Sequence, residues 1–241
     1  MARAKYLCKE RRATGCGRKD SFPTKKTKMK ALLIYSGGLD STTLLYDYKE
    51  SISLAVTFTY GARQDMQQLR RASENCAFLG IEHLVIPLEF MGKYFRSSIL
   101  EGGEEVPHGD YDSENMKSTV VPFRNGIMLS VAVGLAESRG LDTVLLANHG
   151  GDHAIYPDCR PEFISAIDEA ASAGTYVHVR VVSPYCNITK RDIALRGRAL
   201  GVPFEKTYSC YEGRERHCGE CGTCRERKEA LEGFDPTEYE K

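Results

Sequence analysis

Four cysteines near the C-terminus have the spacing of a metal site. The array C-x7-C-x2-C-x2-C is formed by Cys210, Cys218, Cys221 and Cys224. Two-residue spacings let consecutive thiolates converge on one tetrahedral ion, and Gly219 and Gly222 allow the tight turns that this requires. Neighbouring arginines would lower the thiol pKa values and offset the charge of the thiolates. The pattern therefore predicts a bound metal.

Zinc is the preferred ion, with an iron–sulfur cluster as the alternative, because cysteine-only ligation suits both. Four thiolates complete a tetrahedral shell, so we expect a structural site and place the adjacent His217 on the surface. Four of the nine cysteines lie in this one array, and no apolar export segment follows the N-terminus. We therefore expect free thiols and a reducing, cytoplasmic environment.

A glycine-rich turn near the N-terminus has the properties of an anion site. The sequence Ser-Gly-Gly-Leu-Asp-Ser at 36–41 lies between an apolar run at 31–35 and a helical pattern at 39–48. A buried parallel strand is thus expected to turn sharply into a helix. The glycines let main-chain amides approach a ligand, and the helix start supplies unpaired N–H groups. The turn can therefore hold a phosphate.

The turn differs from two common phosphate-binding motifs, and it contains a carboxylate, Asp40. The chain contains no G-x4-G-K-[ST], and G-x-G-x-x-G is absent at this turn. A carboxylate beside phosphates repels them unless a divalent cation bridges the charges, which predicts Mg²⁺ with a polyphosphate. The alternative is a plain β–α turn in which Asp40 caps the helix.

The Ser-Gly-Gly-x-Asp-Ser sequence after a first strand resembles the PP-loop signature of the ATP pyrophosphatase superfamily. Those enzymes split ATP between the α and β phosphates and transfer AMP to a substrate oxygen. The resemblance implies a nucleotide site formed by Tyr35, Ser36, Gly37, Gly38, Leu39, Asp40, Ser41, Thr42, Thr43, Leu44 and Leu45.

Strand and helix patterns alternate along the chain. Strands are expected at 31–35, 54–60, 83–88, 143–147 and 177–182. Helices are expected at 39–48, 66–78, 126–136, 162–173 and 189–200, and the polar segment 91–119 is expected to be a long loop that could serve as a lid. The pattern predicts an α/β fold, with a parallel twisted sheet covered by helices on both faces and a small C-terminal zinc module.

The charge is unevenly distributed although the formal net charge is zero. Eleven lysines and arginines but only two acidic residues lie in the first thirty positions. We interpret 1–28 as a disordered basic extension or a start codon placed too far upstream, with a nucleic-acid-binding arm as the alternative. The predicted units are then a PP-loop domain at 29–205, the zinc module at 206–228 and a tail at 229–241. The sequence contains no run of eighteen apolar residues, so it predicts no membrane-spanning helix.

Five further segments resemble the 7-cyano-7-deazaguanine synthase family. They are YGARQD (60–65), VPFRN (121–125), GGDHAIYPDCRPEF (150–163), ITKRDI (188–193) and TYSCY (207–211). The resemblance extends from Lys30 to about Arg227. The family usually has Gly-Gln-Arg-His where this chain has Gly-Ala-Arg-Gln-Asp at 61–65, and Pro-Gly-Arg-Asn where it has Pro-Phe-Arg-Asn at 122–125.

The resemblance implies conversion of 7-carboxy-7-deazaguanine and ammonia into the nitrile, a precursor for queuosine and archaeosine in tRNA, at the expense of ATP. No segment remains for a glutaminase, so free ammonia is the expected nitrogen source. The expected partners are small molecules, without a stable nucleic acid complex or a membrane, and a homodimer is the candidate oligomer. The alternatives are another PP-loop enzyme, such as a tRNA-thiolating or other adenylating ligase, and a zinc-ribbon nucleic-acid-binding protein.

The resemblance also implies roles for charged residues outside the turn. Arg124 and Lys190 are expected to neutralise charge on the transferring phosphate, with Asp40 near Mg²⁺. The expected ligands of the deazaguanine are Asp152, Tyr156, Asp158 and Arg160. Asp158 could equally cap the helix that begins near Pro161, and Cys159 is expected to be a small buried residue.

Overall fold

The sheet at the centre of the fold is entirely parallel. The computed structural model describes residues 29–111 and 114–241. The strand order is β3-β2-β1-β4-β5, with β1 (Ala31–Ile34), β2 (Ile52–Thr59), β3 (Glu82–Pro87), β4 (Thr143–Leu145) and β5 (Arg180–Val182). Every residue of β1 is buried, which explains its unbroken apolar sequence. The predicted α/β class is confirmed.

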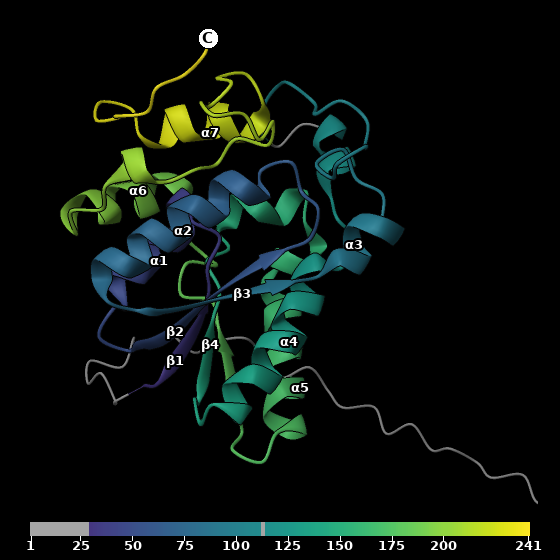
Figure 1. Cartoon of the computed structure of the whole chain (residues 1–241), viewed down its shortest axis with the longest axis vertical. Coiled ribbons are helices and arrows are strands. Elements are labelled where there is room, and N and C mark those ends of the chain that lie inside the picture. Colours follow the sequence, from purple (N-terminus) through teal and green to yellow (C-terminus); the bar gives the residue numbers. More distant parts are fainter. Residues whose placement is uncertain (1–28, 112–113) are drawn as a thin grey trace, which may run out of the picture.

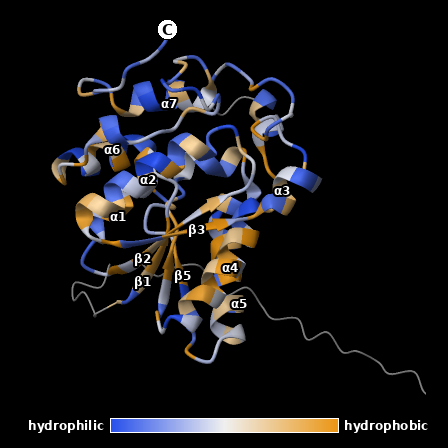
Figure 2. Cartoon of the chain, viewed as in Figure 1, coloured by the Kyte–Doolittle hydropathy of each residue, from blue (hydrophilic) through white to orange (hydrophobic). Residues whose placement is uncertain are grey.

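Helices cover both faces of this sheet (Figure 1). They are α1 (Leu39–Asp47), α2 (Asp65–Leu79), α4 (Arg124–Ser138), α5 (Pro161–Gly174) and α6 (Lys190–Ala199). Leu33 of β1 packs with Leu44 of α1 on one face, whereas its neighbour Leu32 packs with Leu129 of α4 on the other. Successive side chains of a strand point to opposite faces, so β1 contributes to two cores. The strands and much of α4 are hydrophobic in Figure 2.

The remaining elements are short. They are α3 (Glu89–Tyr94), α7 (Gly222–Ala230) and the 3₁₀ helices η1 (Glu114–Thr119), η2 (Gly150–Ala154), η3 (Pro157–Cys159) and η4 (Phe204–Lys206). The expectation that 91–119 is an open loop is wrong in part, because it contains the end of α3 and all of η1. Ile99, Leu100 and Met116 are buried in the core on the α4 side. These apolar residues are spaced too irregularly for a periodic pattern, yet they hold the segment against the sheet.

The start of α4 differs from its predicted position. The helix begins at Arg124 rather than at Gly126, and it is preceded by Phe123 with a φ of 54°. A bulky residue in the left-handed region is strained, whereas glycine is not. This explains physically why a glycine usually occupies this position in the family that the sequence resembles.

The topology creates a crevice between β1 and β4. From β1 the chain continues to β2 and β3 on one side of the sheet, and β4 and β5 lie on the other side. Ligands in open α/β sheets bind where the strand order reverses, beyond the carboxyl ends of the strands. Figure 1 shows α7 and the C-terminal segment lying beyond this region of the molecule.

Some expectations fall outside these observations. The basic extension at 1–28 lies outside the described residues, and the domain boundaries stay predictions, as does the cytoplasmic location. Within 29–111 and 114–241, no helix is both long enough and apolar enough to span a bilayer.

Candidate active site

A cavity of about 1050 Å³, partly open to solvent, occupies the crevice. Loops after β1, β2 and β4 meet there with the starts of α4 and α6 and with the segment 208–211. The structure brings ten of the predicted site residues to its wall: Tyr35, Ser36, Gly38, Leu39, Asp40, Ser41, Arg124, Asp152, Tyr156 and Lys190. Residues from most of the length of the described chain therefore form one site.

The turn after β1 is shaped to leave backbone N–H groups free for a ligand. Gly38 is the N-cap of α1 and provides no side-chain cap, so the first amides of the helix have no side-chain acceptor there. The Ser36 hydroxyl accepts from Gly38 N at 3.2 Å and lies 3.0 Å from the Ser41 hydroxyl. Free amides, hydroxyls and a helix N-terminus together make a site for an anion.

Gly37 and the residues after Ser41 support this turn from behind. Gly37 has a φ of 74°, and a Cβ there would lie 2.5 Å from the Gln68 carbonyl oxygen of α2. Thr42, Thr43, Leu44 and Leu45 are buried in α1 and do not line the cavity. The Thr42 hydroxyl instead lies 3.1 Å from that of Tyr35. The structure thus divides the predicted nucleotide residues into a cavity-facing set and a supporting set.

Lys190 and two carboxylates form a buried charged cluster at the same end of the cavity. Its Nζ lies 3.2 Å from Asp40 Oδ2 and 2.8 Å from Glu226 Oε2. Burial by itself lowers the pKa of Lys190, but the carboxylates of Asp40 and Glu226 outweigh this effect and raise it. Burial raises the pKa of Glu226, while Lys190 opposes that change. Lys190 is therefore a fixed positive charge beside the turn at 36–41, which is called the phosphate turn below.

The other end of the cavity holds Arg124 among tyrosines. The guanidinium lies 5.9 Å from the ring centroids of both Tyr60 and Tyr156, and its Nη1 donates to the Tyr60 hydroxyl at 3.2 Å. The Tyr156 hydroxyl is 3.0 Å from that of Tyr211 and 2.8 Å from that of Thr119. Burial alone lowers the pKa of Arg124, but the surrounding tyrosines and a nearby carboxylate raise it. This end combines aromatic walls with one permanent cation.

Asp152 lies between these two ends. Its Oδ1 accepts from the Tyr111 hydroxyl at 2.9 Å, and its Oδ2 accepts from the backbone N–H of His149 at 3.0 Å. His149 is buried, and its Nδ1 accepts from Gly151 N at 3.1 Å to close the capping box of η2. Asp152 thus faces the cavity but also fixes the loop after β4.

Asp158 and Arg160 do not line the cavity. Asp158 Oδ2 accepts from the backbone N–H of Asn125 at 2.8 Å, which joins the loop after β4 to the first turn of α4. The Arg160 side chain donates from Nε to the carbonyl oxygen of His153 at 3.0 Å. Cys159 is buried as expected, and burial raises the pKa of its thiol, which keeps it protonated.

Asp65 and Gln64, in the segment 61–65 that differs from the usual family sequence, have separate structural roles in the loop after β2. Asp65 Oδ2 accepts from the backbone N–H groups of Tyr60, Gly61 and Ala62 at 2.8 to 3.0 Å, so it fixes the loop. Gln64 lines the cavity, and its Oε1 is buried with no hydrogen-bond partner among the described residues. Its amide therefore remains available to a ligand.

The four cysteines of the C-terminal array meet at one point. Their Sγ atoms all lie within 4.8 Å of one another, and all four side chains are buried. Two of the Sγ–Sγ distances, Cys218–Cys224 and Cys221–Cys210, are 3.9 Å. Tetrahedral zinc with bonds of about 2.3 Å requires sulfur separations of about 3.8 Å. The donor set and its dimensions therefore fit such an ion.

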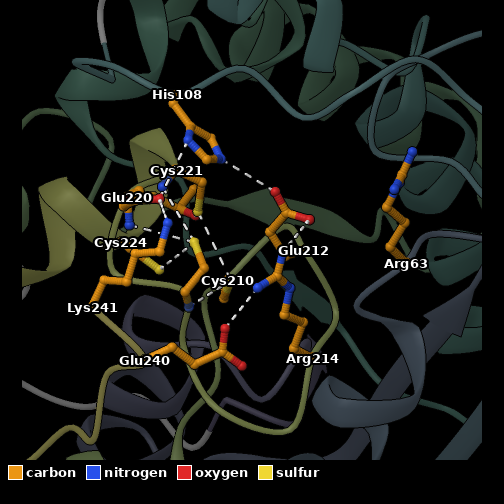
Figure 3. Close-up of polar contacts among 12 residues, drawn as sticks. Arg63, His108, Cys210, Glu212, Arg214, Glu220, Cys221, Cys224, Glu240 and Lys241 are labelled. Atoms are coloured by element: carbon orange, nitrogen blue, oxygen red, sulfur yellow. Dashed lines mark hydrogen bonds and ion pairs between the residues drawn. The ribbon is translucent and has the colours of Figure 1, made fainter.

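Hydrogen bonds among the four thiols act in opposite directions: they favour the thiolate at Cys218 and Cys221 and raise the pKa of Cys210 and Cys224. Hydrogen bonding with the other thiols lowers the pKa of Cys218 far below its ordinary value, and hydrogen bonding with Cys210 is the main reason that Cys221 has a pKa of about 6. The Cys218 sulfur also accepts from the backbone N–H of Cys221 at 3.3 Å. Figure 3 shows His108 between Glu212 and Glu220 beside the sulfurs, 3.3 Å and 3.7 Å from their carboxylates.

The expectation that His217 is a surface residue is wrong. Its side chain is buried between the rings of Tyr208 and Tyr239, with centroid distances of 4.8 Å and 5.8 Å. Its Nε2 accepts from Ser209 N at 3.1 Å. Burial, with a contribution from Arg227, lowers the pKa of His217 to about 3, so it packs as a neutral ring. The C-terminal segment that supplies Tyr239 gives no periodic signal in the sequence.

Several residues that line the cavity, or that contact its lining from behind, were not singled out from the sequence. Tyr60 and Tyr211 lie in two of the segments that were quoted for the family resemblance, but no role in the site was predicted for either residue. Tyr111, His149 and Glu226 were missed altogether. Glu226 follows the cysteine array by two positions and resembles a solvated charge there, and only the folded chain shows that it meets Lys190.

Comparison with known proteins gives consistent matches over most of the chain. Residues 30–235 match the family model described as Queuosine biosynthesis protein QueC. A 7-cyano-7-deazaguanine synthase of Porphyromonas gingivalis is 55% identical over 213 residues, which cover 87% of this chain and 97% of that protein. A protein of the same name from Desulfotalea psychrophila is 50% identical, with 87% and 98% covered. The structure of NMN synthetase from Francisella tularensis matches 78% of this chain and 69% of its own at a TM-score of 0.46 and 15% identity.

Proposed function

Because the chain belongs to the QueC family of queuosine biosynthesis proteins, we propose that it is an ATP-dependent ligase that forms 7-cyano-7-deazaguanine from 7-carboxy-7-deazaguanine and ammonia. The observation that carries this proposal is that one cavity joins an anion-binding turn to an aromatic pocket with a buried arginine. The first suits the phosphates of ATP, and the second suits a flat heterocycle with a carboxylate.

The phosphates of ATP are placed at the turn after β1. The amides at the start of α1 and the hydroxyls of Ser36 and Ser41 hold pyrophosphate, and Lys190 offsets the charge that develops on the α-phosphate. The buried Oδ1 of Asp40 has no hydrogen-bond partner among the described residues, which fits a role as a Mg²⁺ ligand. When bound, Mg²⁺ would screen the phosphates from this carboxylate.

The carboxylate of the substrate is placed at Arg124. This assignment replaces Arg160, whose Nε is bonded to the His153 carbonyl away from the cavity, and it moves Arg124 from the phosphate to the acid. The rings of Tyr60 and Tyr156 can stack against the deazaguanine. Gln64 offers an unpaired amide oxygen for a ring N–H or an amino group. Asp152 is less suited to this task because both of its oxygens already accept hydrogen bonds.

The reaction then balances with one ATP for each of two activations. A carboxylate oxygen attacks the α-phosphorus, pyrophosphate leaves, and ammonia displaces AMP to give the amide with loss of a proton. The amide oxygen attacks the α-phosphorus of a second ATP and a second pyrophosphate leaves; elimination of AMP with loss of the remaining N–H protons then gives the nitrile. Both carboxylate oxygens therefore leave as part of AMP.

The cysteine cluster is proposed to hold zinc. Four sulfur donors leave no position for a substrate, so this ion would be structural rather than catalytic. Its place beside the segment 208–211 gives it a role in shaping the wall of the cavity. The alternative of a zinc-ribbon nucleic-acid-binding protein has no comparable support, because the cluster is packed against an enzyme-like cavity.

The decisive experiment uses 7-carboxy-7-deazaguanine labelled with ¹⁸O in the carboxylate. With ATP, Mg²⁺ and ammonium, the proposal predicts the nitrile by mass spectrometry and AMP that carries one ¹⁸O per molecule. Exchange of labelled pyrophosphate into ATP should require the acid but not ammonium. Formation of ADP, or ATP turnover that is independent of the acid, would contradict the proposal.

A further inference from the structure

Arg227 is a charged residue that the proposed chemistry does not use, although it is completely buried. It lies on α7, three positions after the metal-site residue Cys224. Its guanidinium makes four hydrogen bonds, and all of the acceptors are neutral oxygen atoms. They are Phe204 O at 2.7 Å, Thr207 Oγ1 at 2.9 Å, Ser209 Oγ at 3.1 Å and Thr237 Oγ1 at 2.9 Å. Burying a cation without an ionised partner costs free energy. This cost indicates that the fold uses the fixed hydrogen-bond directions of the guanidinium.

Three of these four acceptors lie in the segment 204–209, which touches the phosphate turn. Within this segment, between Thr207 and Ser209, Tyr208 donates its backbone N–H to the carbonyl oxygen of Gly37 at 3.0 Å. Ser209 and Tyr208 both line the cavity. The next residue is Cys210, the first member of the cysteine cluster. This segment therefore connects the cluster to the turn that we assign to ATP.

The fourth acceptor lies on the other side of the guanidinium. Thr237 belongs to the C-terminal segment and does not line the main cavity. Arg227 thus holds the 204–209 segment with Nη1 and Nη2 and the C-terminal segment with Nε. A planar guanidinium fixes the relative directions of these bonds, which a lysine could not do.

We propose that Arg227 is a positioning residue that couples the cysteine cluster to the phosphate turn, so that metal binding and ATP binding favour one another. A bound metal fixes Cys221 and Cys224 at the start of α7, and α7 in turn fixes Arg227. Arg227 then holds the 204–209 segment in the position where Tyr208 supports Gly37. The ATP part of this inference rests on the proposed function. Because coupling between two sites is reciprocal, ATP must also stabilise the metal site.

A matched pair of isosteric variants separates coupling from simple packing. Thr207→Val and Thr237→Val each remove one hydroxyl acceptor from the same guanidinium, and Thr207→Val also removes the hydrogen bond that the Thr207 hydroxyl donates to Phe204 O at 2.7 Å within the 204–209 segment. Only Thr207 lies in the segment that reaches the phosphate turn. The proposal predicts that Thr207→Val weakens binding of a fluorescent non-hydrolysable ATP analogue about 5-fold, the effect of one ordinary hydrogen bond, whereas Thr237→Val leaves it unchanged within about 2-fold. The same shift should appear in KM for ATP, with kcat unchanged.

The reciprocal effect is measured by metal removal from the purified holoprotein with a chromophoric chelator. The ATP analogue should slow removal about 5-fold or more in the wild type, which is the usual lower range of coupling between sites. In Arg227→Gln the rates with and without the analogue should become equal. Arg225→Gln is the control, because Arg225 is an exposed residue of the same helix that pairs with Asp110. It should keep the wild-type ratio.

Three outcomes would overturn the inference. They are equal weakening of analogue binding in the two threonine variants, an unchanged rate ratio in Arg227→Gln, and a wild-type protein that contains no metal. The threonine pair decides the question if Arg227→Gln does not fold. Neither the binding measurement nor the chelator measurement needs the deazaguanine acid. Loss of nitrile formation with intact coupling would therefore count against the proposed function and not against this inference.

Discussion

The ammonium group of Lys190 lies 3.2 Å from Oδ2 of Asp40, although the two residues are in different parts of the sequence. Lys190 also lies 2.8 Å from Glu226, so one cation is shared by two carboxylates. Under the proposed function, phosphates would bring further negative charge, and a Mg²⁺ ion beside Asp40 would leave the lysine free to turn toward them. Through Lys190 and Glu226, the anion-binding turn is therefore linked to α7, the helix that begins at the last two cysteines of the cluster.

Asp40→Asn should reduce acid-dependent release of pyrophosphate at least about 100-fold. The variant would lose the proposed Mg²⁺ ligand and leaves Lys190 with one carboxylate in place of two, and a lost charge-assisted contact of this kind costs roughly 3 kcal/mol. Asp47→Asn is the matched control, since Asp47 is on the same helix but pairs with Arg196. If Asp40→Asn and Asp47→Asn release pyrophosphate equally fast, Asp40 has no role at the phosphates.

Arg124→Lys should raise KM for the deazaguanine acid by roughly 10- to 100-fold and leave KM for ATP nearly unchanged. A lysine cannot reproduce paired hydrogen bonds to a carboxylate, which are worth about 1.5–3 kcal/mol with a charged partner. Tyr60→Phe removes the 3.2 Å contact to Arg124 and should have a smaller effect of the same kind. Arg139→Lys, at the far end of α4, serves as the control. A change confined to KM for ATP would return Arg124 to the phosphate site.

Cys221→Ser should abolish stoichiometric metal binding and lower the melting temperature by roughly 10 °C, because metal binding contributes folding free energy of several kcal/mol. Cys76→Ser makes the same chemical change at a buried cysteine outside the cluster and should retain the metal. Elemental analysis identifies the ion, and a visible absorption spectrum distinguishes zinc from an iron–sulfur cluster. Full metal content in Cys221→Ser would exclude the cluster as the binding site.

Stability should fall as the pH is lowered through the range in which free histidine titrates, and His83 should contribute to this fall. Burial lowers the pKa of His83, whose Nε2 lies 2.7 Å from the Thr57 hydroxyl. The unfolded chain therefore takes up a proton near pH 6.5 before the folded chain does, which favours unfolding below that pH. Between about pH 7.5 and about pH 5.5, the unfolding free energy of the wild type should decrease more than that of His83→Gln. Parallel pH profiles in denaturant titrations would show that His83 makes no contribution.

Much of this architecture is visible in local sequence patterns. The apolar run before Ser36 and the spacing of the cysteines are properties of neighbouring residues, so the strand-to-helix turn and the convergence of the four cysteines could both be predicted. The strand–helix alternation fixed the class of fold in the same way. Arg124 was also identified as a cavity residue, although its tyrosine surroundings are the reason that we propose it for the acid rather than for the phosphates.

The rest depends on contacts between distant segments. Glu226 and His149 come together only when α7 packs against the loop after β4, where His149 Nε2 lies 3.6 Å from Glu226 Oε1. Arg160 resembles a ligand for a carboxylate in the sequence, yet the folded loop directs its Nε to a carbonyl oxygen. Neither outcome follows from spacing or composition.

The central claim, that one cavity holds ATP at its first β–α turn and the acid at its arginine, is tested most directly by a crystal structure with both ligands. A non-hydrolysable ATP analogue and 7-carboxy-7-deazaguanine would be soaked together with Mg²⁺. The account predicts phosphate density against the amides at 37–41, with the carboxylate of the acid within hydrogen-bond distance of Arg124. Nucleotide density elsewhere, with this turn empty, would contradict it.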